Sequence, residues 1–219
     1  MSARRAGGFT LIEVLVAMVV MAIMSLMAWQ GVDGIVRTRA ANQVRLEQTL
    51  RLETVISQWE QDLASLQGKD PAAISESTDV PELTCDGQSV RLTRRAEGGL
   101  QVVVWALRPD SSNSTWQRWA GPAVTTKTAL LESFQRTLQF QGNEAGQLRA
   151  LTGLEQWQVY FFVRNAWANC QSTGDVDSSA SGPPALQRQV RPDGVRLVLA
   201  FAPGSGLNGS LVRDIRIAP

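Results

Sequence analysis

Apolar and polar positions divide the chain into three parts with different patterns. Residues 14–32 form a continuous apolar run without a charged side chain, bounded by Glu13 and Asp33. At about 1.5 Å per residue, a helix over this run spans nearly the whole hydrocarbon core of a membrane, which is about 30 Å thick. The pattern therefore predicts a transmembrane helix over residues 9–30. It also places the carboxylate of Glu13 where an unpaired charge is costly.

The apolar pattern becomes one-sided after this run. Residues 35–66 contain neither glycine nor proline, and a 4-3-4-3 spacing gathers one set of apolar side chains on a single helix face. This set is Leu52, Ile56, Trp59, Leu63 and Leu66. We expect an amphipathic continuation of the helix over residues 31–66, packed on the core of its own domain, with a coiled coil as the alternative. The polar residues Gln58, Glu60, Gln61 and Asp62 are predicted to lie mostly off this face.

The remainder of the chain, residues 67–219, reads as short strands and loops. Apolar and β-branched residues cluster in segments that are separated by turn-forming residues, as in antiparallel sheets. The predicted strands cover residues 89–95, 100–107, 114–121, 155–167, 194–203 and 211–217, with one short helix over 128–140 and a loop over 172–184. The first two strands should form a hairpin. The predicted fold is therefore α+β, with a long N-terminal helix packed on an antiparallel β-sheet domain.

Two pairs of side chains in these strands have open interpretations. Trp116 and Trp119 are three positions apart, so both cannot face the same side of a regular strand. We expect one of them to be exposed or to lie at an interface. Arg94 and Arg95 are predicted to occupy a solvated hairpin end, with contact to an acidic partner as the less favoured reading.

Composition argues against most enzyme and metal chemistry. The chain has no histidine, which removes Ser/His/Asp and Cys/His catalysis as well as the commonest transition-metal ligand. Asp175 and Asp177 resemble the opening of a calcium loop, but Ala180 stands where that loop requires glycine. We therefore predict no catalytic residue, no metal site and no cofactor. A net charge of +1 gives no reason to expect nucleic acid as a partner.

The sequence GGFTLIEV at residues 7–14 is the most specific motif in the chain. It follows a short leader with two arginines and no acidic residue, and it opens the apolar run. A secretory signal peptide is disfavoured because residues 28–30 make a poor cleavage site after the run. The motif resembles the class III signal of type IV pilins and type II secretion pseudopilins. A plain single-span anchor would leave Glu13 unexplained.

The resemblance implies a role for each residue of the motif. Residues 1–8 would be a leader peptide that a prepilin peptidase removes between Gly8 and Phe9, and the new amino group of Phe9 would be N-methylated. Glu13 matches the acidic residue of the family. In an assembling filament it would pair with the amine of Phe9, in its own subunit or in a neighbour, and so favour one axial register.

The whole chain resembles the J-type minor pseudopilin of the type II secretion system. This resemblance implies a non-enzymatic subunit of the pseudopilus tip that helps to export folded proteins across the outer membrane. Its partners would be I-, K- and H-type minor pseudopilins and the major pseudopilin. It would cross the bacterial inner membrane once and place residues 67–219 in the periplasm. The alternative is a minor pilin of a type IV pilus that acts in assembly priming, adhesion or DNA uptake.

Cys85 and Cys170 are the only cysteines of the chain. The arginines before the apolar run favour a cytoplasmic N-terminus, which would place both cysteines in an oxidising periplasm. Each lies near the end of a predicted strand, so one sheet edge could bring them together. An intrachain disulfide is favoured, and an interchain bond or two buried thiols remain as alternatives.

Overall fold

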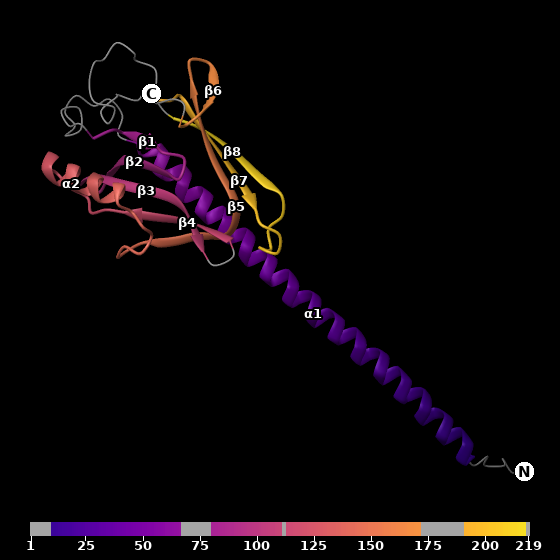
Figure 1. The fold of residues 1–219 in the computed structure, drawn as a ribbon. Coiled ribbons are helices and arrows are strands. Elements are labelled where there is room, and N and C mark those ends of the chain that lie inside the picture. Colours follow the sequence, from indigo (N-terminus) through magenta and orange to yellow (C-terminus); the bar gives the residue numbers. More distant parts are fainter. Residues whose placement is uncertain (1–9, 67–79, 111–112, 172–190, 218–219) are drawn as a thin grey trace, which may run out of the picture. The chain divides into compact units, whose positions relative to one another are not determined.

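A computed structural model describes residues 10–66, 80–110, 113–171 and 191–217 of the chain (Figure 1). Their Cα positions group into two compact units, Met1–Glu47 and Gln48–Pro219, and we describe each by itself. The helix α1 (Leu11–Ala64) begins in the first unit and ends in the second. The predicted α+β architecture, in which a long N-terminal helix is followed by an antiparallel sheet, is confirmed.

The last turns of α1 carry the predicted apolar face. Ile56, Trp59, Leu63 and Leu66 are buried, and Leu52 is partly buried against the same core. The regular helix ends at Ala64, two residues earlier than expected, because Leu66 instead forms an isolated β-bridge with Arg94. Burial of a large apolar side chain contributes about 1.5–3 kcal/mol, so this face is sufficient to hold the helix against the sheet.

The sheet of the second unit is antiparallel throughout. Its strands are β1 (Leu83–Cys85), β2 (Ser89–Ala96), β3 (Gly99–Asp110), β4 (Asn113–Ala120), β5 (Leu148–Val163), β6 (Ala166–Asn169), β7 (Gly194–Phe201) and β8 (Ser210–Arg216). The strand order is β1-β2-β3-β4-β5-β7-β8, and β6 pairs with β5 as a short hairpin arm.

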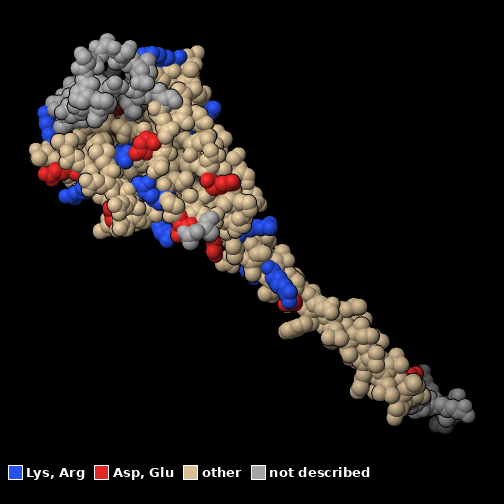
Figure 2. Space-filling view, viewed as in Figure 1, with Lys and Arg blue, Asp and Glu red and all other residues tan. Residues whose placement is uncertain are grey.

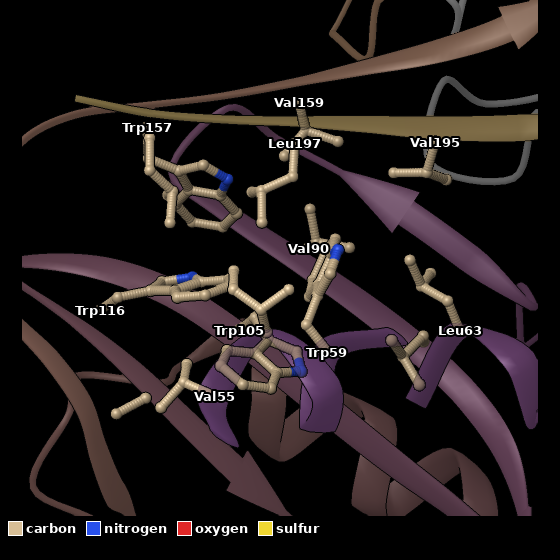
Figure 3. Packing of buried hydrophobic residues seen from close by; sticks show 14 of the residues in the cluster. Val55, Trp59, Leu63, Val90, Trp105, Trp116, Trp157, Val159, Val195 and Leu197 are labelled. Carbon is tan, nitrogen blue, oxygen red and sulfur yellow. The ribbon is translucent and has the colours of Figure 1, made fainter. Parts of the chain in front are cut away.

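The sheet curls around the C-terminal turns of α1 (Figure 1). A single apolar cluster joins the helix to strands along the whole order, from Leu83 in β1 to Ile215 in β8. At its centre Trp59 of α1 lies 5.6 Å from Trp105 of β3 and 5.5 Å from Trp116 of β4, measured between ring centroids (Figure 3). The concave face of the sheet therefore forms the core of the domain.

The convex face of the first strands is covered by α2 (Lys127–Leu138) and the loop that follows it. The helix begins at Thr126, whose side chain accepts a hydrogen bond from the backbone N–H of Ala129, as an N-cap does. Leu130 packs on Val102, which points away from the central core. The side chains of α2 thus close a second, smaller apolar layer.

Both tryptophans of β4 are buried, so the prediction that one is exposed is wrong. Trp116 faces the central core, while Trp119 faces the opposite side, packs with Phe140 and donates its indole N–H to the backbone oxygen of Ala145. The inference that they face opposite sides is correct. The sequence did not show that residues after α2 fold back over the second face.

The strand predicted over residues 155–167 is in fact two strands. β5 is longer and begins at Leu148, while Arg164 and Asn165 form a tight turn with positive φ angles of 52° and 65° before β6. Asparagine tolerates this left-handed region better than most residues, which makes an Arg-Asn turn feasible without glycine. The strand β1 was also missed, because three residues are too few to show a period.

Candidate functional site

Glu13 lies in the first turn of α1 and contacts the residue that starts the helix. Its Oε2 atom accepts two hydrogen bonds from Thr10, at 2.9 Å from the backbone N and 2.8 Å from Oγ1. The backbone N–H of Glu13 donates in turn to the oxygen of Thr10 at 3.1 Å. The carboxylate thus closes one half of a capping box and satisfies a backbone donor that the helix cannot use.

This geometry leaves part of the Glu13 carboxylate unused. Both hydrogen bonds reach Oε2, and among residues 10 onward that the structure describes no donor reaches Oε1. A carboxylate accepts from several directions, so Oε1 can receive a further cationic or polar donor. Gly8 and Phe9 lie outside the described residues, and their roles in cleavage and methylation therefore stay predictions.

The side chains that follow Glu13 form a long apolar surface. Large apolar residues from Leu11 to Val36 have between about half and four-fifths of their surface exposed in the isolated chain, including Trp29 at 73%. Figure 2 shows this part of the helix as a surface almost free of charge. The helix is long enough and apolar enough to cross a membrane, which fits a single-pass anchor.

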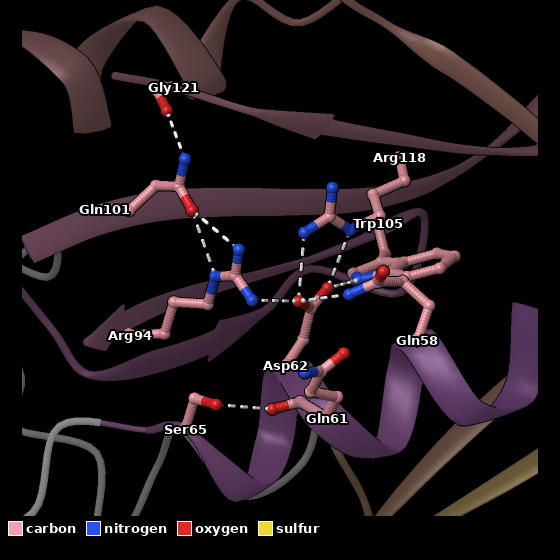
Figure 4. A network of polar contacts seen from close by, with 9 residues as sticks. All are labelled: Gln58, Gln61, Asp62, Ser65, Arg94, Gln101, Trp105, Arg118 and Gly121. Atoms are coloured by element: carbon pink, nitrogen blue, oxygen red, sulfur yellow. Dashed lines mark hydrogen bonds and ion pairs between the residues drawn. The ribbon is translucent and has the colours of Figure 1, made fainter. Parts of the chain in front are cut away.

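A buried ion cluster fixes the other end of α1 to the sheet. Asp62 is fully buried, and its two oxygens receive Arg118 through Nε at 2.8 Å and through the terminal amino group at 2.9 Å. Arg94 reaches Oδ1 at 2.9 Å, and the indole N–H of Trp105 reaches Oδ2 at 2.8 Å. Gln58, one turn earlier on the helix, donates to Oδ1 at 3.1 Å (Figure 4).

These contacts correct two predictions from the sequence. Asp62 was placed mostly off the packed face, and Arg94 at a solvated hairpin end, yet the two form an ion pair at the base of the core. Arg94 also donates twice to Gln101, whose amide donates to the backbone oxygen of Gly121. The alternation of residues along β2 could have indicated that Arg94 is buried, because it places Arg94 on the same concave face as Val90 and Leu92.

Cys85 and Cys170 are joined by a disulfide across the open side of the curled sheet. Cys85 ends β1, whereas Cys170 follows β6 and donates its backbone N–H to Val159 of β5 at 3.0 Å. In a flat sheet these positions would be more than about 14 Å apart, given a strand spacing of about 4.8 Å. Their Cα atoms are 5.7 Å apart, so the bond closes the curl of the sheet around α1.

The bonded ends are further connected by a polar contact. The side chain of Gln171 donates to the backbone oxygen of Asp86 at 2.9 Å. Asp86 in turn caps the turn before β2, accepts from the backbone of Ser89 at 2.6 Å and pairs with Arg91 at 2.8 Å. The first edge of the sheet is therefore held by covalent, polar and ionic links together.

Comparison with known families identifies the N-terminal region. Residues 3–29 match the family described as the prokaryotic N-terminal methylation motif, and this range contains Gly8, Phe9 and Glu13. The chain carries a prepilin-type methylation motif. The motif supports a place in the type IV pilin-like and pseudopilin family, and it implies processing by a prepilin peptidase and assembly with other pilin-like subunits. No curated protein matches the chain.

The motif and the fold agree with each other. The matched motif opens α1, which combines an apolar N-terminal part, long enough to cross a membrane, with a C-terminal part buried in a sheet. Together they favour a structural subunit over an enzyme. The calcium-like residues Asp175 and Asp177 lie outside the described residues, so the prediction that they bind no metal stays untested.

Proposed function

We propose that this protein is a minor pseudopilin of a type II secretion system, of the J type, and that it belongs to the tip of the pseudopilus. The observation that carries the proposal is a prepilin-type motif whose acid, Glu13, starts an apolar helix that leads into a curled-sheet domain. In this role the protein sits in the bacterial inner membrane with its sheet domain in the periplasm, and it helps the short filament to export folded proteins.

The geometry of Glu13 suggests how such a subunit would select its place in the filament. Thr10 orients the carboxylate through Oε2, and Oε1 is left for a donor from outside the described residues. A cationic N-terminal amine at Phe9, in the same subunit or in a neighbour, would neutralise the charge in an apolar environment. Helices shifted along the axis would leave the carboxylate unpaired, which is strongly penalised there.

The buried ion cluster around Asp62 would help the subunit to withstand the forces of filament assembly. A subunit that is pulled from the membrane transmits force from its helix to its domain. Asp62 joins α1 to β2 and β4 through Arg94 and Arg118, and the apolar face of the helix is buried in the same domain. The helix and the sheet would therefore move as one piece during assembly.

A minor pilin of a type IV pilus is the second candidate, because the motif is shared by both systems. The position of the disulfide favours a pseudopilin, because a resemblance to type IV pilins would imply a late disulfide near the chain end, and no cysteine follows Cys170.

One genetic experiment separates the two systems. We expect deletion of the gene to abolish release of folded exoproteins, to leave surface pili and DNA uptake intact, and to be complemented by the full-length chain. Neighbouring genes for a secretin, an assembly ATPase and other pseudopilins would agree with this result. Loss of pili or of DNA uptake, with normal secretion, would assign the protein to a type IV pilus instead.

A further inference from the structure

The last strand of the sheet, β8, has one side on which no strand of the described chain pairs. Phe201 donates its backbone N–H to Gly209, and Ile217 donates to Asp193, so odd-numbered residues direct their backbone groups toward β7. In an antiparallel ladder these directions alternate. The backbone N–H and C=O groups of Ser210, Val212, Asp214 and Arg216 therefore point outward, away from the sheet.

This outward side opens into a groove between β8 and α1. The groove is a shallow depression of about 590 Å³ that is open to solvent, and it is lined by Glu60, Ala64, Val212, Arg213, Asp214 and Ile215. Ala64 and Val212 are both exposed, Val212 to 54%. The unpaired edge of a seven-residue strand without proline is a template for pairing with a further strand, because its amides and carbonyls are already aligned.

The two edges of the sheet differ in availability. β1 is tied by the Cys85–Cys170 disulfide and by the contact between Gln171 and Asp86. Within the described residues β8 carries no covalent link, and its ion pair with α1, between Arg213 and Glu60, uses a side chain and leaves the outward backbone groups unpaired. Strand addition, a recognised mode of peptide binding, is therefore open to β8 rather than to β1.

The charges along β8 indicate which kind of strand fits. Asp214 is neutralised by Arg196, with both oxygens at 2.6 Å from the guanidinium, and Arg213 is paired with Glu60 at 2.6 Å. Arg216 is exposed, and among the described residues no ion pair reaches it. Arg216 and Val212 lie on the same face of β8, about 13 Å apart, with the neutralised Asp214 between them. This face suits a strand that carries an acid and an apolar residue at matching positions.

A second copy of this chain fits less well. Antiparallel self-pairing through the outward groups places Arg213 opposite Arg213 in one central register and Asp214 opposite Asp214 in the other. Like charges directly opposite each other destabilise a strand pair, although the ion pairs with Glu60 and Arg196 reduce this effect. In these two registers Arg216 lies opposite Ser210 or Val212 and meets no acid, so the charges favour a different subunit over a homodimer.

We propose that β8 receives an extended strand from another pilin-like subunit, which adds to the sheet in the groove beside α1 and places an acidic residue near Arg216. The inference rests on the proposed function, since it requires that this chain assembles with such subunits. It adds a contact between folded domains to the contacts between helices. Backbone hydrogen bonds would supply affinity, and Arg216 and Val212 would supply specificity.

Amide hydrogen exchange of the full-length chain in detergent tests the inference. We compare the chain alone with the chain co-purified with the motif-bearing subunits encoded beside it. In the chain alone, amides of Val212 and Asp214 should exchange fast and those of Leu211 and Arg213 slowly. In the assembly, the even-numbered amides should slow by roughly tenfold or more, while the odd-numbered ones stay slow.

A matched pair of variants gives a second readout. Val212→Pro removes an outward N–H and keeps the bonds to β7, and edge strands tolerate proline at such positions. Val212→Thr keeps the N–H. We expect the proline variant to melt close to the wild type and to recover roughly tenfold less partner subunit than the threonine variant, which keeps the N–H and a β-branched side chain.

Three results would overturn the inference. Fast exchange of Val212 and Asp214 in the assembly would overturn strand addition to β8. It would leave the proposed function standing, because co-purification itself would still support assembly with pilin-like subunits. Concentration-dependent protection of these amides in the chain alone would replace the partner subunit by a second copy. Failure to co-purify with any motif-bearing subunit would overturn this inference and the proposed function together.

Discussion

Asp62 and Arg118 form a two-pronged ion pair between α1 and β4, although 56 positions separate them in the chain. The carboxylate is fully buried, and the side chain of Arg118 is only 13% exposed. Arg118 also lies over the Trp105 ring, with its central carbon 5.8 Å from the ring centroid. The pair therefore connects the polar end of the core with its aromatic centre, and it fixes the helix in one position against the sheet.

Replacing Asp62 by asparagine should strongly destabilise the domain. The two arginines would lose their shared carboxylate in a buried site, and breaking a buried pair typically costs about 3–5 kcal/mol. We expect a loss of that size in the free energy of unfolding, measured by chemical denaturation of the full-length chain in detergent. Glu60→Gln is the matched control, because it removes a more exposed pair on the same helix and should cost at most about 1 kcal/mol. If both variants lost the same free energy of unfolding, burial of the Asp62 ion pairs would not explain their contribution to stability.

Acid should weaken the first edge of the sheet through Asp86. Partial burial raises the pKa of this carboxyl, but hydrogen bonds and the ion pair from Arg91 and Ser89 outweigh burial and hold the pKa below its usual value. A folded-state pKa below the unfolded one gives stability that is present above the unfolded pKa and is lost as the pH falls through the folded pKa.

The window for this effect opens below about pH 4, near the ordinary pKa of aspartate. We expect the free energy of unfolding to fall with decreasing pH in this window, and Asp86→Asn to flatten the profile. Glu155→Gln, an exposed substitution on β5 with the same change in charge, should leave the slope as it is. If both variants show the wild-type slope, Asp86 does not carry the effect.

Substitutions of Glu13 should separate its charge from its capping function. Glu13→Ala is expected to insert in the membrane and to fold its sheet domain normally, yet to enter filaments or support secretion poorly. Glu13→Gln retains an acceptor for Thr10 but has no charge, so it should be nearly as defective if charge pairing sets the register. Filament incorporation and limited proteolysis of the domain measure the two properties. Full activity of the glutamine variant would assign Glu13 a capping role only.

Processing should depend on Gly8. Replacing it with a bulky residue is expected to leave an unprocessed precursor in the membrane, because the resemblance to prepilins implies cleavage after this glycine. Mass spectrometry of the purified chain reads the N-terminus directly. A mutant chain that still begins at Phe9, methylated or not, would show that cleavage does not require this glycine.

The disulfide should be important for stability. For the 85-residue separation between Cys85 and Cys170, the chain-entropy model gives about 4–5 kcal/mol as an upper estimate, and natural bonds typically contribute about 2–4 kcal/mol. We expect the free energy of unfolding of the Cys85→Ser, Cys170→Ser double variant to be lower than that of the wild type by about 2–4 kcal/mol. Alkylation of the unfolded, unreduced wild-type protein should label neither thiol. Two readily labelled thiols would show that the bond does not form.

The sequence by itself determined the parts of this protein whose signals are local. An uninterrupted apolar run specifies the first part of α1, a 4-3-4-3 spacing identifies its packed face, and the residues around Gly8 carry the methylation motif. The β2–β3 hairpin, β4, β7 and β8 also follow from short alternating segments and the turns between them. Each of these signals arises from neighbours in the chain, so no knowledge of distant contacts is required.

The tertiary structure alone decided which polar residues are buried and how the sheet closes. Asp62 is read as polar in any local pattern, and only the registers of β2 and β4 place Arg94 and Arg118 beside it. Trp119 is buried because the loop after α2 covers it, and Cys85 meets Cys170 because the sheet curls. A charge is stable in a core only when its partners arrive from elsewhere in the chain, and no local pattern encodes that arrival.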